Sequence, residues 1–294
     1  MMETIVNARN ITKFYGDFKA LDRVNFSIPT GAITGLIGPN GAGKTTTLKA
    51  LLGLCDFDGE LDVAGRDPRK SRHKLMEDVC FIADVGILPR WMKVDRALDF
   101  VDSVHPRFDR SRADTFLANT EIKRRSKIKD LSKGMITQLH LALVMSIDVE
   151  LLVLDEPTLG LDIIYRKEFY DRLLNDYYDG NRTVIISTHQ VEEIETLLTH
   201  LMFIDRGQIV LDMAMSNIPD QFVEVLVKTG NLDAAMALGP IHTRNMLGKK
   251  ACLFENRSAD ELAHFGELHT PSVADLFVAK MKSNKLNERV NVDE

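Results

Sequence analysis

Residues 38–45 read Gly38-Pro39-Asn40-Gly41-Ala42-Gly43-Lys44-Thr45 and fit the pattern G-x-x-x-x-G-K-[ST]. A short apolar run, Ile33–Ile37, leads into this loop, and Thr45–Leu54 has helical spacing. Glycines let backbone N–H groups curl around a phosphate, and the positive end of the following helix points at the anion. The sequence therefore predicts a phosphate-binding loop with these candidate ligands: Gly38, Pro39, Asn40, Gly41, Ala42, Gly43, Lys44, Thr45 and Thr46.

Two side chains of this loop have distinct expected roles. Lys44 would reach the β- and γ-phosphate oxygens of a nucleoside triphosphate, and the Thr45 hydroxyl would be a ligand of Mg²⁺. The alternative is a chance glycine-rich turn. From average residue usage the bare pattern occurs in roughly one chain in a hundred of this length. The strand before it and the helix after it make coincidence rarer, so the phosphate-binding interpretation is favoured.

Two carboxylates follow a second apolar run. Leu151–Leu154 is fully apolar, as expected of a parallel strand buried on both faces, and Asp155 and Glu156 come directly after it. Ligands of open α/β sheets bind at this carboxyl edge. We expect Asp155 to hold Mg²⁺ through water and Glu156 to polarise an attacking water. Taken alone, such a pair is more often a strand end that meets solvent. Downstream of a phosphate loop, the catalytic interpretation is favoured.

A histidine ends the next apolar run. His189 follows Val184–Thr188, so it would lie at the same edge of the sheet. There it could contact the γ-phosphate and order the catalytic water, although a histidine in this position is by itself more often a structural polar residue. The histidines show no paired metal-ligand spacing, and we expect no zinc site.

Composition narrows the class of protein. The chain has 294 residues, 45% of them hydrophobic, and a formal net charge of −6, which argues against nucleic acid as the main partner. Its three cysteines form no C-x-x-C pair and are expected to be reduced thiols. The N-terminus has no apolar region of the signal-peptide type, and no apolar run reaches the roughly 18 residues of a spanning helix. If the protein works at a membrane, other chains must supply the spanning part.

Strands alternate with helices along most of the chain, which predicts an α/β domain with a mainly parallel sheet. Mainly helical spacing covers about residues 94–146, and a composition shift comes at Ser216-Asn217-Ile218-Pro219. We therefore expect a first domain over residues 1–215, with a helical subdomain at about 84–147, and a small accessory α+β domain over 216–294. The polar end, Lys282–Glu294, is expected to fray.

With these pieces in order, residues 3–213 resemble the ABC ATPases. The family's signature sequence matches Leu131-Ser132-Lys133-Gly134-Met135, where Ser132 would cap a helix. The resemblance implies a P-loop NTPase of the ABC type with antiparallel N-terminal strands. It also implies that Ser132 and the Gly134 N–H bind the γ-phosphate of ATP held by the other subunit of a homodimer. Without the family, Ser-Lys-Gly is merely a helix start.

Three further residues match the family pattern. Asp155–Asp162 is similar to the run from the Walker-B strand to the D-loop, which would place Asp162 at the dimer seam. Tyr15 falls where the family has an aromatic residue that stacks on adenine, although an ordinary turn tyrosine is the alternative. His189 takes the position of the switch histidine.

The chain also departs from the pattern. Lys133 and Met135 replace the usual glycine and glutamine of the signature, a form similar to that of the drug- and antibiotic-export branch. Asp84 stands where a glutamine is expected, and a carboxylate there can still bind Mg²⁺ or water. The following stretch, Gly86–Met92, would lie beside the groove that receives a helix of the membrane subunit. Alternatively, Trp91 and Met92 fill the core of the helical subdomain.

The resemblance implies an ATP-binding and ATP-hydrolysing subunit that closes as a homodimer over two Mg-ATP. It would drive a separate transmembrane permease from the cytoplasmic face of the cell membrane, as a peripheral protein and most simply as an exporter. One alternative is a soluble ABC ATPase without a transport role. The interval between Lys44 and Ser132 leaves no room for the long coiled coil typical of some such relatives. A second alternative, motivated by Asp84 and Lys133, is a nucleotide-binding regulator that does not hydrolyse ATP.

Overall fold

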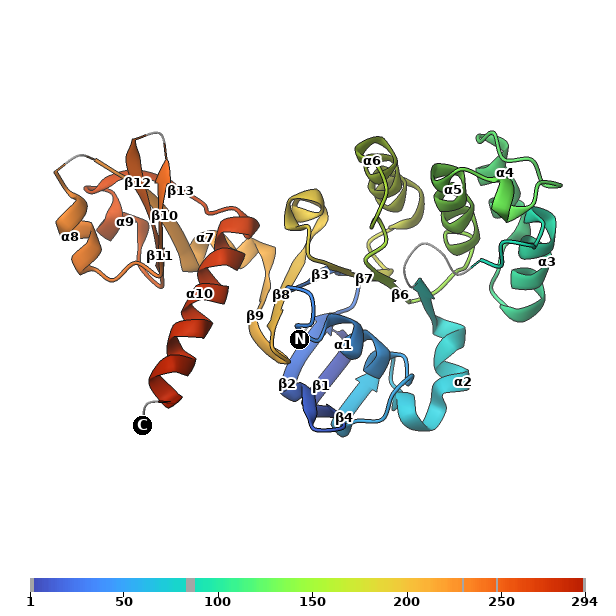
Figure 1. The fold of residues 1–294 in the computed structure, drawn as a ribbon, viewed down its shortest axis with the longest axis horizontal. Coiled ribbons are helices and arrows are strands. Elements are labelled where there is room, and N and C mark those ends of the chain that lie inside the picture. Colours follow the sequence, from blue (N-terminus) through green and yellow to red (C-terminus); the bar gives the residue numbers. More distant parts are fainter. Residues whose placement is uncertain (1–2, 83–87, 229, 247, 293–294) are drawn as a thin grey trace.

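The computed structural model describes residues 3–82, 88–228, 230–246 and 248–292. Figure 1 shows two sheets in the middle of the molecule, helices at one end and a third sheet at the other. The six-stranded sheet has the order β5-β6-β7-β3-β8-β9, and only β9 runs antiparallel to its neighbour. Its strands are β3 (Ile33–Ile37), β5 (Val79–Ile82), β6 (Leu151–Asp155), β7 (Thr183–Thr188), β8 (His200–Asp205) and β9 (Gln208–Ala214).

Both faces of the five parallel strands are buried, and alternate residues of these strands contribute to different cores. On β6, Leu152 and Leu154 join a core beneath the helices, whereas Leu151 and Val153 face the opposite core. This arrangement explains why β6 is apolar without alternation. Four helices contribute to the core on the first face: α3 (Val94–Val104), α4 (Arg110–Ala118), α5 (Lys133–Val144) and α6 (Ile163–Arg172). Of these, α3 and α4 lie at the end of the molecule, beyond α5 (Figure 1).

The opposite core lies under a second, antiparallel sheet of order β2-β1-β4. The predicted antiparallel N-terminal strands are confirmed, but the length of the first one was not predicted. Register shifts interrupt its pairing, one of them between Ala8 and Ile11, so the apolar period of two is broken in the sequence. The elements on this side are β1 (Thr4–Tyr15), β2 (Phe18–Pro29), β4 (Asp58–Val63), α1 (Lys44–Leu51) and α2 (Pro68–Asp78).

The third sheet belongs to the C-terminal part and has the order β11-β12-β10-β13. It has a small core of its own, formed with α8 and α9, while Phe222 and Leu253 join the main core together with α10. The predicted boundary between residues 215 and 216 stays a prediction. The elements are α7 (Ile218–Gln221), β10 (Phe222–Val227), α8 (Leu232–Ala237), β11 (His242–Met246), β12 (Lys249–Glu255), α9 (Ala259–Leu262), β13 (Gly266–His269) and α10 (Val273–Val292).

Three local predictions need correction. The helix expected over 191–198 is two 3₁₀ turns, Val191–Glu193 and Glu195–Leu197. Val191, Ile194 and Leu197 all pack against the main core, and a spacing of three residues is that of a 3₁₀ helix. The helix expected over 165–178 changes to a π turn at Leu173–Tyr177. The tail expected to fray from residue 282 continues α10 to Val292 instead, and the Asn284 side chain is hydrogen-bonded to the main body.

Candidate functional site

The glycine-rich loop joins β3 to α1 and has backbone conformations that favour glycine. Gly41 has φ 81° and Gly43, the N-cap of α1, has φ 113°. A Cβ atom on Gly38 would lie 2.4 Å from the Ile204 carbonyl oxygen, so the loop packs directly on the end of β8. The Lys44 side chain is 6% exposed, and its Nζ donates hydrogen bonds to the Gly38 and Pro39 carbonyls at 2.7 and 3.4 Å. The lysine therefore lies along the loop, as the motif predicts.

The predicted acidic pair lies at the carboxyl end of β6, beside this lysine. The Lys44 Nζ is 3.3 Å from the Glu156 carboxylate, and Asp155 accepts a hydrogen bond from the Ser187 hydroxyl. Glu156 has φ 48°, a left-handed conformation that is costly for a non-glycine residue. Its N–H is held by the Ser187 carbonyl at 3.1 Å, so the neighbouring strand fixes the direction of the carboxylate.

The predicted histidine completes this group. His189 follows β7 directly, and its Nδ1 lies 3.0 Å from both carboxylate oxygens of Glu156. Glu156 therefore lies between a buried ammonium group and an imidazole. Such a carboxylate can accept a proton from a water molecule while the imidazole stays oriented by the hydrogen bond.

A pocket of about 320 Å³ opens over the loop. Tyr15 and Phe18 form its outer wall, and both rings are exposed, at 46% and 63%. Thr45, Thr46 and Glu156 line its inner end. Sequence reasoning identified Tyr15 but missed Phe18. The signal was the Gly16-Asp17 turn between the two aromatic residues, since a tight hairpin pairs its flanking positions and brings these rings to one rim.

The signature residues Ser132 and Gly134 lie at the start of α5, away from the pocket over the loop. Ser132 is the N-cap of α5 and accepts a hydrogen bond from the Met135 N–H at 3.2 Å, which confirms the predicted cap. The Tyr165 ring of α6 packs closely over Gly134, since a Cβ atom there would lie 2.4 Å from Cζ of that ring. Asp162 caps α6 through the N–H groups of Ile164 and Tyr165. None of Ser132, Gly134 and Asp162 is among the described residues that line the pocket over the loop.

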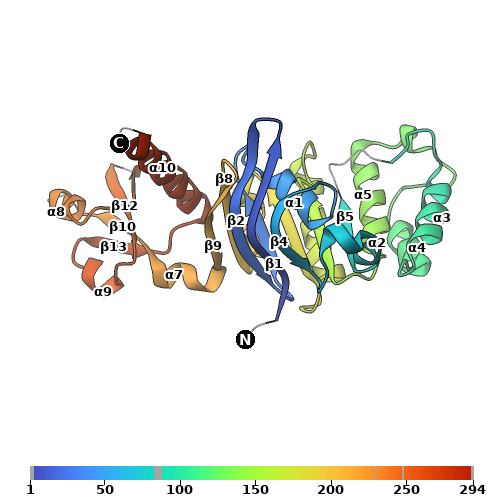
Figure 2. The same ribbon diagram turned by 90° about the horizontal axis from the view of Figure 1, so that it is seen from below.

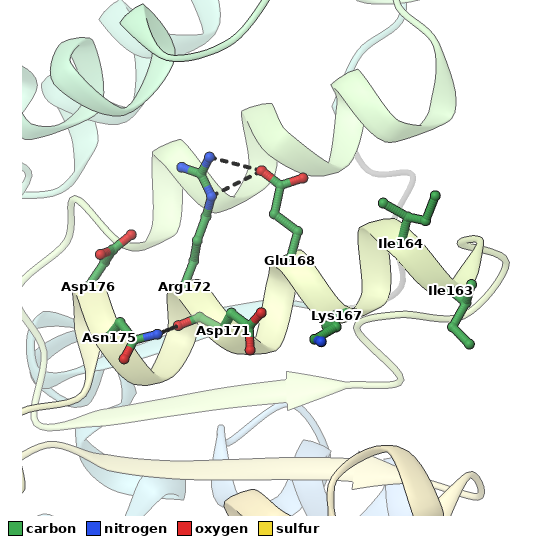
Figure 3. A pocket seen from close by; sticks show the side chains of 8 residues that line it. All are labelled: Ile163, Ile164, Lys167, Glu168, Asp171, Arg172, Asn175 and Asp176. Atoms are coloured by element: carbon green, nitrogen blue, oxygen red, sulfur yellow. Dashed lines mark hydrogen bonds and ion pairs between the residues drawn. The ribbon is translucent and has the colours of Figure 1, made fainter.

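The start of α6 presents apolar side chains to solvent. Figure 3 shows Ile163 and Ile164 projecting from this end of the helix, beside a shallow cavity of about 450 Å³. They are 82% and 74% exposed. Farther along the helix, Arg172 is paired with Glu168 at 2.8 Å. The surface next to Asp162 is therefore apolar, a composition typical of an interface.

Two polar residues near the site were missed by sequence reasoning. Ser187 contacts both Asp155 and the Glu156 N–H, and its signal was a hydroxyl residue directly after the apolar run Val184–Ile186 of β7. Arg166 donates to the Leu161 carbonyl at 2.7 Å and to Gln190 at 2.8 Å, and it is also paired with Glu193. It therefore connects the segment before α6 to the segment after His189, a long-range contact that no local pattern indicates.

The remaining predictions concern the segment after β5. Asp84, Gly86 and Ile87 lie outside the described residues. Trp91 is 74% exposed, so the alternative in which it fills the core of the helical subdomain is wrong, whereas Met92 is half-buried against the main core. No helix in the described part of the chain combines the length and apolarity needed to cross a membrane.

Comparison with solved structures defines the class of fold. The chain is similar to an ATP-binding subunit of an ABC transporter, with a TM-score of 0.67 and 21% identity over 74% of this chain and 92% of the other. It is also similar to a dimeric ATP-binding cassette in a post-hydrolysis state bound to ADP and Pi, with a TM-score of 0.60 and 19% identity over 71% and 98% of the two chains. The fold is that of ATP-binding cassettes.

Sequence comparison gives the family. The ABC transporter family model matches residues 21–159. The "Nod factor export ATP-binding protein I" of Cupriavidus metallidurans is 33% identical over 220 residues, which cover 70% of each chain. The "Daunorubicin resistance ATP-binding protein DrrA3" of Streptomyces coeruleorubidus is 30% identical over 252 residues, 82% of this chain and 79% of the relative. The chain therefore belongs to the family of ABC transporter ATP-binding subunits.

Proposed function

We propose that this subunit hydrolyses ATP at the phosphate loop and that hydrolysis drives an exporter. The observation that carries the proposal is the contact of Lys44, Glu156 and His189 within one chain, at the edge of the sheet where the loop and two strands end. A triphosphate seated on the loop would bring its γ-phosphate to this group. The Tyr15 and Phe18 rings at the rim would stack on the base.

In this mechanism Glu156 accepts the proton of the attacking water, while His189, oriented by Glu156, keeps that water in line with the γ-phosphate. Lys44 moves from the carboxylate to the β- and γ-oxygens and offsets their charge. Phosphoryl transfer depends on such positioning rather than on covalent catalysis. The strained backbone of Glu156 and its Ser187 contacts hold the base in place before substrate arrives.

Asp155 and Thr45 would hold the Mg²⁺ that accompanies ATP. Their donors are a carboxylate and a hydroxyl oxygen, the type that Mg²⁺ prefers, and Thr45 lines the pocket. Asp155 is buried and accepts a hydrogen bond from the Ser187 hydroxyl, so its carboxylate is held at the end of β6 beside the loop. When bound, the metal would supply positive charge to the phosphate oxygens. Asp84 is proposed as a further ligand on sequence grounds alone.

The second half of each site would come from another copy of the chain. Ser132 is exposed at the N-terminal tip of α5, outside the pocket of its own chain. In a head-to-tail dimer this tip and the Gly134 N–H would face the γ-phosphate on the partner, with Asp162 at the seam. A cassette of the same fold is dimeric with ADP and Pi, which supports this arrangement.

The membrane role rests on the relatives and on one surface. The relatives' names refer to Nod factor export and daunorubicin resistance, which favours an exporter. Trp91 is exposed on the helical side of the molecule, as are Phe100 and Val104 of α3, and these side chains suit the docking of a permease helix. We propose that the subunit lies at the cytoplasmic face of the membrane, with residues 1–215 as its nucleotide-binding domain and 216–294 as an accessory domain.

Steady-state phosphate release tests the catalytic assignment. Glu156→Gln should lower turnover by about 10²-fold or more, because the amide cannot accept a proton, while ATP binding is retained. Glu150→Gln is the matched control, since Glu150 is exposed and precedes the opposite end of β6. Equal rates in wild type and Glu156→Gln would overturn the role of Glu156. Tight ATP binding without turnover in the wild type would favour a regulator.

Purification from native membranes tests the partner. We expect the chain to be recovered with a subunit that has several membrane spans. Recovery with ribosomes or DNA, and never with such a subunit, would rule out the transporter role.

A further inference from the structure

The last helix contacts the segment that follows His189. α10 lies between the C-terminal sheet and strands β8 and β9 in both views (Figures 1 and 2). The backbone N–H of Val273, its first residue, donates a hydrogen bond to the Glu195 side chain at 3.0 Å. Val273 and Leu276 are buried in the same core as Val191 and Ile194. The helix is therefore anchored at its start to the main body.

Farther along, the same helix contacts the end of β8. The ring of Phe277 meets that of Phe203 edge-on, with centroids 5.2 Å apart and an interplanar angle of 78°. About two turns later, Asn284 Nδ2 donates a hydrogen bond to the Asp205 carboxylate at 3.1 Å. Asp205 is only 5% exposed, so this contact is shielded from solvent.

The end of β8 in turn supports the phosphate loop. The Gly207 N–H, in the turn after Asp205, donates a hydrogen bond to the Ala42 carbonyl at 2.8 Å. The Ile204 carbonyl packs so closely on Gly38 that not even a Cβ atom fits between them. A cavity of about 430 Å³ between the loop and α10 is lined by Pro39, Asn40, Gly41, Ala42, Asp205, Arg206, Phe277 and Met281. A displacement of Asp205 would therefore be transmitted to the loop.

We infer that Phe277 and Asn284 are positioning residues for the phosphate loop. Through Phe203 and Asp205 they fix the turn that hydrogen-bonds Ala42, so α10 sets the affinity of the loop for ATP. This gives the C-terminal part a role that no motif within it indicates. The inference rests on the proposed ATP site, since nucleotide affinity is its readout.

The test is a charge swap at the hydrogen bond, in the full-length chain. Asn284→Asp places a second carboxylate against Asp205 and should raise the Kd for ATP about threefold to tenfold, with kcat at saturating ATP changed less than about twofold. Adding Asp205→Asn to this variant restores an amide–carboxylate pair in the reverse order and should return the Kd to within about twofold of wild type. Val278→Asp is the matched control, because it adds the same charge on the exposed side of α10.

A purely structural role for α10 predicts a different pattern. In that case Asn284→Asp would lower the melting temperature of the chain without nucleotide but leave the Kd for ATP of the folded fraction unchanged. This result would overturn the inference. Failure of the swap to restore affinity would also overturn it. If Asn284→Asp does not fold, Asn284→Ala removes the hydrogen bond without adding charge and should raise Kd about twofold to threefold. A wild-type chain that binds no ATP would contradict the proposed function instead, so the two failures are distinguishable.

Discussion

The phosphate-loop end of the proposed site is linked by contacts within the chain, whereas the tip of α5 presents its polar groups outward. Lys44, Glu156 and His189 contact one another, and Lys44 is nearly inaccessible to solvent. Ser132 is exposed, and its hydroxyl oxygen accepts the local capping hydrogen bond from the Met135 N–H. Lys44, Glu156 and His189 form an organised half of the site, which is in place before substrate arrives. Ser132 and the tip of α5 form an open half, which has the properties of a surface that needs a second molecule.

The largest expected effect removes the cation of the organised half. Lys44→Ala should lower ATP turnover about 10²- to 10³-fold, because no other buried cation of the described site can stabilise the charge that develops on the phosphates. Lys49→Ala, on the exposed side of the same helix, should leave the rate within about twofold. Phosphate release at saturating ATP measures both. If Lys44→Ala were as active as the Lys49→Ala control, Lys44 would not supply the charge needed for hydrolysis, and the assignment of the organised half would be wrong.

A smaller effect is expected at the open half. Ser132→Asp and Ser132→Asn should cap α5 about equally well, so their melting temperatures should agree. The added charge of Ser132→Asp should lower turnover about tenfold to a hundredfold, because it would face the γ-phosphate on the partner chain. Ser132→Asn lacks that charge and serves as the control. Equal turnover in the two variants would place the tip of α5 away from the nucleotide.

The smallest effect concerns the body of α5, which is packed in the main core although the tip of the helix is exposed to solvent. Burial lowers the pKa of His140 from 6.5 to about 4, and its Nε2 has no hydrogen-bond partner among the described residues. The unfolded chain therefore binds this proton more readily, so His140 costs no stability above pH 6.5 and destabilises progressively as pH falls toward 4.

Urea unfolding of wild type and His140→Leu at several pH values measures the contribution of His140 to the free energy of unfolding. Between pH 7.5 and pH 5 the wild type should lose about 2 kcal/mol more of its unfolding free energy than the variant. The other titrating groups are the same in both chains, so their contributions cancel in the comparison. Parallel losses would mean that His140 is solvated and that α5 is packed less tightly than described.

The same contrast explains what the sequence could predict. Residues 38–45 and 151–156 lie within single strand–loop units, where local chemistry determines the conformation, and both were located correctly. The cap at Ser132 was predicted for the same reason. Contacts between distant segments, such as Arg166 with Glu193, have no local signal and were missed.

The C-terminal part was the least predictable. Lys282–Glu294 is polar, and polar ends of chains usually fray, but α10 is held by a hydrogen bond to a carboxylate 79 positions earlier. Which residue Asn284 contacts depends on how the third sheet packs on the main body, and the local sequence does not reveal this. The length of β1 was not predicted for a different reason, because bulges interrupt its alternation of apolar and polar residues.

Mixed dimers test the central claim, that each ATP is shared by two chains, most directly. Lys44→Ala damages only the organised half and Ser132→Asp only the open half, so in a mixed dimer one of the two sites is intact. Random pairing makes about half of the dimers mixed, so an equal mixture should recover about a quarter of the wild-type turnover. Turnover that stays at the mean of the two separate variants would contradict the shared site.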